Sequence, residues 1–335
     1  MSPMPGRSTH RPTPSHHDLP HHDHEVDRRT LLKGVALGVG FGIVGSLVGT
    51  HAAEAAATKV SLPGFDAFAS SVKTFRSGKY YLVESTGLPA HDLMVGITNW
   101  QQQVPIPQPY TGSNAWKIPV KPVLSANPIS ARNNLFRGAI ALAVNGVPIF
   151  NALNNRGEDS YLIGELDEWG GHCGKADDYH YHVAPLHLSK TVGRDKPIAY
   201  ALDGFPIYGE TEPDGKAVTG LDEFNGHLDS KKRYHYHGTR TYPYHNGGMR
   251  GVVTVADGQV DPQPRANSGR PPGEPLRGAT ITAFERSGGD HFELAYTLAG
   301  ATHRIDYTAT MNAVTMTFID PSGTSSTQTY ARRPN

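Results

Sequence analysis

An internal duplication constrains the fold of this chain more than any other feature. The segment Tyr179-His180-Tyr181-His182 recurs as Tyr234-His235-Tyr236-His237, and the Gly171-His172 before it recurs as Gly226-His227, in both cases 55 residues later. Each half is about one supersecondary unit long, too small to bury both of its faces alone. We therefore expect the two halves to pack together about a pseudo-twofold axis.

A second pair of motifs extends the repeat upstream. Asn145-Gly146-Val147-Pro148-Ile149-Phe150 corresponds to Asp203-Gly204-Phe205-Pro206-Ile207-Tyr208, 58 residues later. Asn-Gly and Asp-Gly are strong hairpin signals, and the residues that precede each turn are apolar on both faces. The sequence thus predicts buried hairpins at the centre of the duplicated domain.

Together these motifs resemble the YHYH domain family of exported proteins. The resemblance also rests on Asp167-Glu168-Trp169-Gly170 and its counterpart Asp222-Glu223-Phe224-Asn225, and it covers about residues 75–255. It implies an exported protein but no particular reaction. Many relatives are expected to carry a cysteine after Asp-Glu, where this chain has Trp169 and Phe224, so any disulfide role of that cysteine is absent here.

Composition indicates a mainly β protein without a nucleic-acid partner. The 335 residues include 37 Gly, 26 Pro and 15 Tyr, which suits short strands joined by turns. Because 31 basic residues balance 31 acidic ones, no charge excess favours nucleic acid or an anionic membrane. The partner expected instead is an unknown small molecule or cell-wall ligand.

Residues 1–57 are interpreted as a twin-arginine signal peptide. Asp27-Arg28-Arg29-Thr30-Leu31-Leu32-Lys33 precedes a glycine-diluted apolar stretch at 34–48, and Ala55-Ala56-Ala57 supplies a cleavage signal. The alternative is a single membrane anchor, for which the stretch is short. Cleavage predicts a periplasmic or extracellular protein with no stable membrane insertion. A histidine-rich tract at 16–24 lies in the segment that would be removed.

The mature chain is expected to hold one duplicated domain and one small domain. The duplicated domain spans 58–255, with halves at about 138–190 and 197–251, and its proline-rich stretch 104–128 is expected to run over the surface. Residues 256–278 resemble a Pro-rich linker. Alternating runs at 279–335 predict a small antiparallel β meander whose role is docking or packing.

The duplicated histidines suggest metal binding. Histidines two residues apart on a strand point to the same face and can reach one ion, and a third lies eight residues earlier in each half. The ligand pool is His172, His180, His182, His227, His235 and His237. Imidazole suits copper or zinc, and three nitrogens would leave a position open for water or substrate. Packing about the pseudo-twofold axis is expected to turn both histidine faces toward a common cleft, although the sequence leaves open whether they form one shared site or two. Alternatively, the histidines only support half-buried strands.

Further residues are weaker candidates. The carboxylates Asp167, Glu168, Asp222 and Glu223 could orient imidazole groups, act as a general base or be solvated turn residues. His91, the lone Cys173 and His245 are possible additional ligands, although a buried apolar role is commoner for a free cysteine.

These observations leave two main functional hypotheses. The first is an exported metal-binding protein, or a metalloenzyme with an open three-histidine site. The alternative is a metal-free extracellular carbohydrate- or cell-wall-binding module, whose histidine side chains should diverge. A weaker third is a metal-free hydrolase that uses the Asp-Glu pairs as acid and base.

Overall fold

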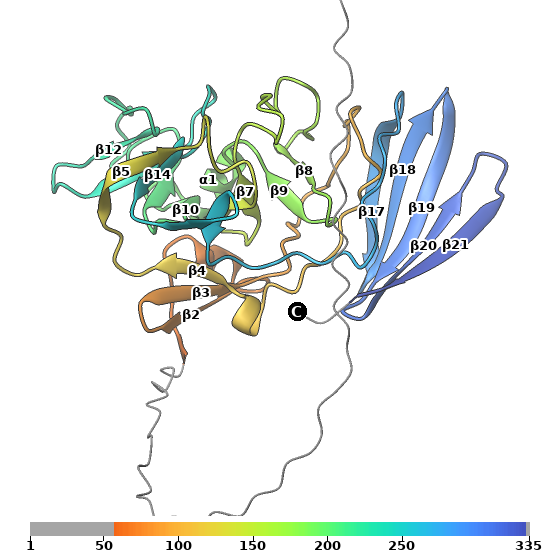
Figure 1. Ribbon diagram of the computed structural model, residues 1–335, viewed down its shortest axis with the longest axis horizontal. Coiled ribbons are helices and arrows are strands. Elements are labelled where there is room, and N and C mark those ends of the chain that lie inside the picture. Colours follow the sequence, from red (N-terminus) through yellow and green to blue (C-terminus); the bar gives the residue numbers. More distant parts are fainter. Residues whose placement is uncertain (1–56, 333–335) are drawn as a thin grey trace, which may run out of the picture. The chain divides into compact units, whose positions relative to one another are not determined.

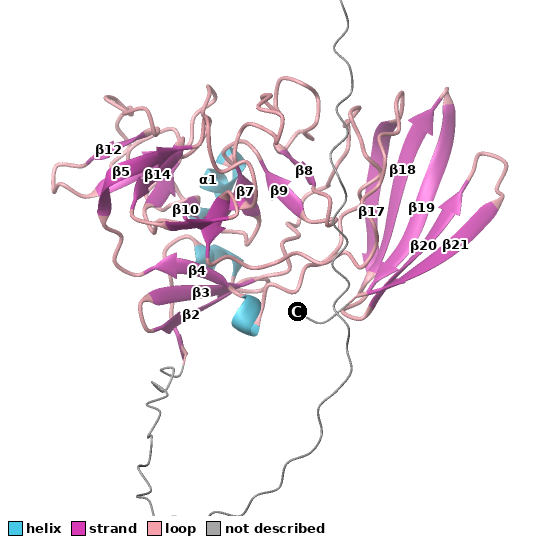
Figure 2. Ribbon diagram, viewed as in Figure 1, coloured by secondary structure: helices cyan, strands magenta, loops and turns pink. Residues whose placement is uncertain are grey.

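The computed structural model describes residues 57–332, and within this range the protein is mainly β, as predicted (Figure 2). The twin-arginine motif, the cleavage signal up to residue 56 and the histidine-rich tract lie outside the described residues. The helical elements in this range are one short α-helix and three 3-10 turns: α1 Ser189–Val192, η1 Phe65–Phe68, η2 Gly112–Asn114 and η3 Leu186–Leu188. No helix in the described part of the chain is long and apolar enough to cross a membrane.

The duplicated motifs form one eight-stranded sheet (Figure 1). Its strand order is β12-β13-β11-β10-β6-β7-β9-β8, so the two halves meet at β10 and β6. The first half supplies β6 Ala139–Ala143, β7 Pro148–Phe150, β8 Gly171–Cys173 and β9 Tyr179–Tyr181. The second half supplies β10 Ala199–Ala201, β11 Pro206–Tyr208, β12 Gly226–Leu228 and β13 Tyr234–His237.

The pairing in the two halves is the same. In each half a hairpin (β6–β7 or β10–β11) adds a parallel strand (β9 or β13), which pairs with an antiparallel edge strand (β8 or β12). At the centre β6 and β10 run antiparallel, with Leu142 opposite Tyr200. The apolar strand β6 is buried along its whole length, because the rest of the domain covers both faces. The predicted packing of the two repeats against each other is confirmed, and it takes the form of one continuous sheet.

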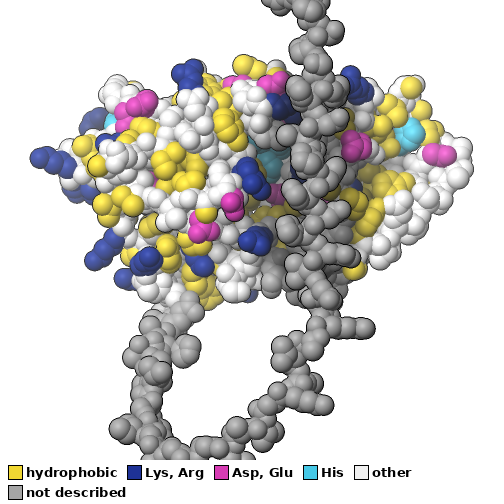
Figure 3. Space-filling view, in the orientation of Figure 1, with side chains coloured by type: hydrophobic (Ala, Val, Ile, Leu, Met, Phe, Trp, Pro, Cys, Tyr) yellow, Lys and Arg dark blue, Asp and Glu magenta, His cyan; other side chains and the backbone are white. Residues whose placement is uncertain are grey.

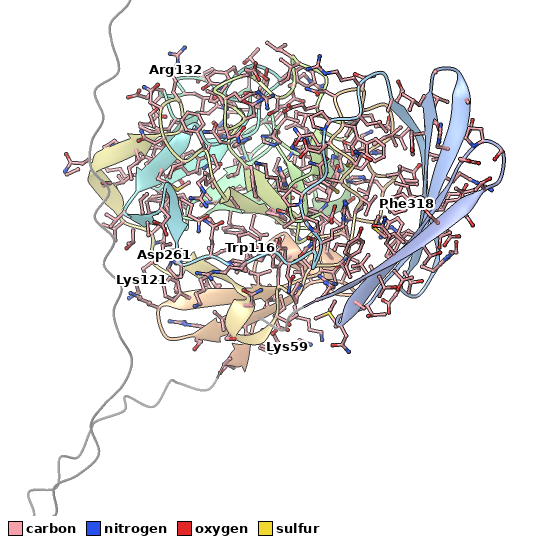
Figure 4. All side chains as sticks on the ribbon, turned by 45° about the vertical axis from the view of Figure 1, so that its right-hand side comes forward. Lys59, Trp116, Lys121, Arg132, Asp261 and Phe318 are labelled. Atoms are coloured by element: carbon pink, nitrogen blue, oxygen red, sulfur yellow. The ribbon has the colours of Figure 1, made fainter. Side chains whose placement is uncertain are left out.

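Other strands between residues 58 and 261 form three smaller sheets. A four-stranded antiparallel sheet is made of β1 Thr58–Lys59, β2 Lys73–Ser77, β3 Tyr80–Glu84 and β4 Trp116–Pro119. Two ribbons pair β5 Leu124–Ser130 with β14 Gly248–Gly251, and β15 Thr254–Ala256 with β16 Gln259–Asp261. Trp116 of β4 is 2% exposed and lies in the interior, whereas Lys121 just beyond the strand is exposed (Figure 4).

The C-terminal residues form the expected antiparallel meander. Its five strands are β17 Thr280–Gly288, β18 His291–Leu298, β19 Ala301–Ala309, β20 Ala313–Ile319 and β21 Ser325–Ala331. One face carries buried aromatic and aliphatic side chains of the common hydrophobic core, and Phe318 packs against them (Figure 4). The Tyr307 hydroxyl donates to the carbonyl of Pro105 at 2.7 Å, so the meander is fastened to the preceding loops.

Two Pro-rich stretches are held more tightly than their composition suggests. Val104 and Ile106 are fully buried, so the expectation that residues 104–128 run over the surface is wrong for this part. In the segment interpreted as a linker, Arg270 forms a bidentate ion pair with the buried Asp177, with N–O distances of 2.6 and 2.7 Å. Composition reports the backbone preference of such segments but not their long-range partners.

Candidate metal centres

Strand alternation places the repeated histidines on one face of the eight-stranded sheet and the repeated tyrosines on the other. His172 on the edge strand β8 lies directly opposite His180 on β9, and His227 on the edge strand β12 lies opposite His235 on β13. The period of two along a strand therefore collects three imidazoles in each half. Only small patches of histidine reach the face shown in Figure 3, in keeping with the burial of most of these rings.

The first cluster consists of three histidines whose Nε2 atoms converge. Nε2 of His182 lies 3.0 Å from Nε2 of His172 and 3.1 Å from Nε2 of His180. The ring of Phe150 stacks on His180 with ring centroids 3.8 Å apart, which fixes one wall of the cluster. His180 and His182 are 3% and 5% exposed, while His172 is half-buried at the sheet edge. Solvent or a ligand would thus approach from the side of His172.

The second cluster has the same three histidines and adds a carboxylate. Nε2 of His227 and His235 lie 3.1 Å apart. Glu212 places Oε1 at 3.0 Å from Nε2 of His227 and Oε2 at 3.3 and 3.7 Å from Nε2 of His235 and His237. All four donor atoms lie within 4.8 Å of one another, as do the three donor atoms of the first cluster. Each group can hold a metal ion.

Backbone carbonyls fix the tautomer of most of these rings. Nδ1 of His182 donates to the carbonyl of Asn151, and Nδ1 of His237 donates to the carbonyl of Gly209, the equivalent residue of the repeat. His180 and His227 donate in the same way to the carbonyls of Asp178 and Thr219. A carbonyl oxygen only accepts, so Nδ1 carries the hydrogen and a neutral ring has a bare lone pair at Nε2.

The Nε2 lone pairs of His180 and His182 are both bare and face one another, so they need a cation between them. Two nitrogens bound tetrahedrally to one ion at about 2.0–2.1 Å lie about 3.3 Å apart, close to the spacing in both clusters. Nε2 of His237 is buried without a hydrogen-bond partner, an arrangement that costs about 1–3 kcal/mol when nothing satisfies the atom. A metal ion would satisfy that lone pair, so the residues present fit such an ion.

Burial keeps four of the six imidazoles, those of His172, His180, His182 and His237, in the neutral form that binds metal. Desolvation lowers the pKa of His172 to about 4 and that of His182 to about 3, and the neighbouring imidazoles lower the pKa of His182 further. Desolvation also lowers the pKa of His180 well below its usual value and that of His237 to about 4. Protons therefore compete weakly for these nitrogens near neutral pH.

The tyrosines of the repeat hold the histidine strands in place. Hydroxyls of Tyr179 and Tyr234 donate to the carboxylates of Asp167 and Asp222, each at 2.8 Å. The hydroxyl of Tyr236 likewise donates to the buried Asp203 at 2.5 Å. These contacts lie on the face of the strands opposite the imidazoles. Each half of the motif thus combines an anchoring face with a ligand face.

The carboxylates singled out in the sequence do not orient imidazoles. Besides the tyrosines, Asp167 accepts the backbone N–H groups of its own turn and Asp222 does the same in the second half, so both organise the turns before β8 and β12. Burial raises the pKa of Asp167 to about 6. Glu168 and Glu223 are exposed. Of the three roles considered for these residues, orienting the imidazoles does not fit Asp167 and Asp222, because the turns fold under the tyrosine face. The exposed Glu168 and Glu223 agree with solvated turn residues.

The weaker ligand candidates lie outside both clusters. Nε2 of His91 contacts the Tyr181 hydroxyl at 2.8 Å, and its ring stacks on Trp169. His245 is buried with Nε2 directed at the carbonyl of His182. Cys173 follows His172 on β8 and therefore points to the opposite face, where burial raises its thiol pKa. None of these three joins a group of metal donors in the described residues.

The two clusters are separate. The strands β9 and β13, which carry the Tyr-His-Tyr-His runs, are five strand spacings apart in the sheet, or about 24 Å at about 4.8 Å a step. The strands β8 and β12 lie at opposite edges (Figure 1). The expectation of one cleft shared by both histidine faces is therefore wrong, because the apolar hairpins that form the core also hold the clusters apart.

Sequence reasoning missed Glu212. It lies four residues beyond the end of β11, outside every recognised motif, and reaches the histidines because β11 runs parallel to β13. If the 58-residue offset is kept and the alignment is continued four residues past the end of the motif, Glu212 corresponds to Asn154. An alignment of the two halves that continued past the motifs would have found this charged difference.

The fold and the clusters define a mainly β protein with a histidine cluster near each end of a duplicated sheet. Residues 115–217 match the family model described as YHYH protein, which confirms the resemblance over that span. The span includes the first cluster and Glu212, whereas His227, His235 and His237 lie beyond its end. No curated protein and no solved structure matches the chain.

Proposed function

We propose that this chain is an exported metal-binding protein that holds a divalent transition metal, copper or zinc, in each of its two histidine clusters. The observation that carries the proposal is the convergence of the Nε2 atoms in each cluster, where two of the three rings donate Nδ1–H to a backbone carbonyl and so turn a bare Nε2 inward. Imidazole nitrogen suits both metals. Export rests on the twin-arginine pattern in the sequence, and it agrees with the family resemblance.

The first cluster also supports a metalloenzyme. His172, His180 and His182 would hold the ion through three nitrogens, the number used by catalytic zinc sites that retain an open position. A metal bound there would supply Lewis-acid activation of a water or substrate oxygen. The protein itself supplies neutral, pre-oriented imidazoles and an apolar wall formed by Phe150.

The alternative, a metal-free carbohydrate- or cell-wall-binding module, is less well supported. It requires imidazoles that diverge, with both ring nitrogens engaged by the protein, and the Nε2 atoms instead converge. One feature favours it: a cleft of about 1020 Å³ lies between the halves, lined by residues that include Trp169, Tyr244 and Arg240. Such a module would bind its ligand equally well with and without a chelator.

Elemental analysis of the purified exported protein tests the proposal. After reconstitution with zinc or copper and removal of loose metal, about two equivalents per chain are expected, one per cluster. A preparation of the variant His182→Ala/His235→Ala/His237→Ala, which leaves two donors in each cluster, serves as control and should retain almost none. Less than about a tenth of an equivalent in the folded wild-type chain would overturn metal binding, and retention by the triple variant would place the metal elsewhere.

A further inference from the structure

The two clusters differ at one equivalent position of the repeat. Asn154 and Glu212 each follow the strand that precedes the histidine motifs, and the backbone around them is the same. The N–H of Asn154 donates to the carbonyl of Glu158, and the N–H of Glu212 donates to the carbonyl of Lys216, again 58 residues later. The position therefore has a defined place in both halves, and only its side chain has changed.

Glu212 turns its carboxylate into the second cluster. Both of its oxygens face imidazole Nε2 atoms at 3.0–3.7 Å, although a carboxylate and a bare nitrogen lone pair repel each other. Either a proton or a metal ion between them removes that repulsion. With an ion in place, the protein supplies three nitrogens and one oxygen, a complete tetrahedral set.

Asn154 turns its side chain away from the first cluster. Its Oδ1 accepts the backbone N–H groups of Arg156 and Glu158, and its Nδ2 donates to the carboxylates of Glu158 and Glu165. Glu165 is buried but is itself bound by Arg156 at 2.7 Å. Among the described residues no fourth donor completes the first cluster.

From this difference we infer that the two sites have divided their tasks, which rests on the proposed metal binding. The second site is a closed site with three histidines and a carboxylate that retains its ion. The first is an open site with three histidines that takes an exogenous fourth ligand, a water molecule or a small anion. The charges agree: a divalent ion with three neutral imidazoles keeps a charge of +2, whereas Glu212 reduces it to +1.

Cobalt(II) and azide test the inference on the full chain, because cobalt absorption reports coordination and azide binds only where a position is open. In His235→Ala/His237→Ala, which leaves only two donors in the second cluster and so keeps only the first site, azide should shift the cobalt spectrum with saturation. In His182→Ala, which keeps only the second site, azide should leave the spectrum almost unchanged. Equal responses of the two variants would overturn the division of tasks.

Glu212→Gln in the His182→Ala background gives the decisive comparison, since it keeps the side-chain shape and removes the charge. It should weaken cobalt binding by at least about tenfold, because even residues that only hydrogen-bond a metal ligand contribute about tenfold to metal affinity. It should also make the second site respond to azide. The matched control Glu210→Gln, on a neighbouring exposed residue, should change neither property. Folding of each variant is checked by circular dichroism.

The outcomes separate this inference from the proposed function. If the folded wild-type chain binds no cobalt, zinc or copper, the proposed function itself fails. If both sites bind cobalt but Glu212→Gln leaves affinity and azide response unchanged, metal binding stands and the division of tasks is overturned.

Discussion

Nε2 of His172 and Nε2 of His182 lie 3.0 Å apart across the β8–β9 pair. His182 donates its only ring hydrogen to the carbonyl of Asn151, so this contact is not a hydrogen bond donated by His182. The strand pairing, the tyrosine anchors and the carbonyl contacts hold the two rings together without relying on attraction between them. The site is thus pre-organised by the protein, which keeps the ordering cost of binding an ion small.

Reducing either cluster to two donors should remove one metal ion. His182→Ala and His235→Ala/His237→Ala are each expected to lower the bound metal from about two equivalents to about one, because each cluster lies at its own end of the sheet. Metal content by elemental analysis and thermal unfolding with and without metal are the measurements. His303→Ala, in the β meander, is the control and should retain both ions. A complete loss of metal in either cluster variant would contradict two independent sites.

The ligand face of the motif could be predicted because alternation is a local property of strands. The tetrapeptide and the earlier glycine-histidine pair together fix which imidazoles meet once β8 pairs with β9 and β12 with β13. The role of the aspartates could not be predicted in this way. Their partners, Tyr179 and Tyr234, depend on how each turn folds back under the sheet, which sequence spacing does not report.

Other features depended on contacts between distant segments. Glu212 joins the second cluster through the parallel pairing of β11 with β13, and Arg270 reaches Asp177 across 93 residues of chain. Neither residue lies in a motif, and the surrounding composition suggests only turn or linker. The duplication nevertheless holds information that single motifs lack, since each departure from symmetry marks a place where the halves have diverged.

Acidification should destabilise the metal-free protein between pH 6.5 and about 4. The folded-state pKa of His172 and His237 is about 4, below the usual 6.5, so the unfolded chain binds more protons in this window. Each such histidine contributes about 3 kcal/mol that is present above pH 6.5 and lost as the pH falls through the window. Asp167 and Asp178, with their pKa raised by burial to about 6 and about 7, act in the opposite direction but are outnumbered by the histidines whose pKa burial lowers.

Chemical denaturation in the presence of a chelator at pH 4.5, 5.5 and 6.5 measures this effect. The free energy of unfolding should fall as the pH is lowered, and His182→Gln should flatten the dependence because it removes one group whose pKa is lowered to about 3. A metal-free protein that became more stable on acidification would contradict the assignment of neutral, buried histidines.

The turn before β8 contains a small residue that faces a larger one, and in the second half a larger residue takes the place of the small one and a glycine takes the place of the larger one. Gly170 adopts φ +84°, and a Cβ there would overlap Cγ2 of Val183. In the second half Asn225 adopts φ 64°, and the position equivalent to Val183 is Gly238. Gly170→Asn should therefore destabilise the protein by about 2 kcal/mol through this overlap.

Adding Val183→Gly to Gly170→Asn rebuilds the pair found in the second half. A double-mutant cycle by chemical denaturation should show a favourable coupling of about 1 kcal/mol or more, because the glycine removes the overlap that the asparagine creates. Strictly additive effects of the two substitutions would show that the turns are not equivalent in packing.

The segment at 256–278 should contribute to stability rather than behave as a free tether. Arg270 and Asp177 are 9% and 2% exposed, and the guanidinium also donates to the carbonyl of Gln102 at 2.7 Å. Arg270→Ala would leave the Asp177 carboxylate buried without its counter-ion, which typically costs about 3–5 kcal/mol. Chemical denaturation measures the loss, and Arg277→Ala, at an exposed position of the same segment, should change the free energy of unfolding by less than about 0.5 kcal/mol.

Because the penalty comes from the uncompensated charge, Arg270→Ala/Asp177→Asn should be more stable than Arg270→Ala alone. If the double variant is no more stable than the single one, the segment is held by packing and not by this ion pair.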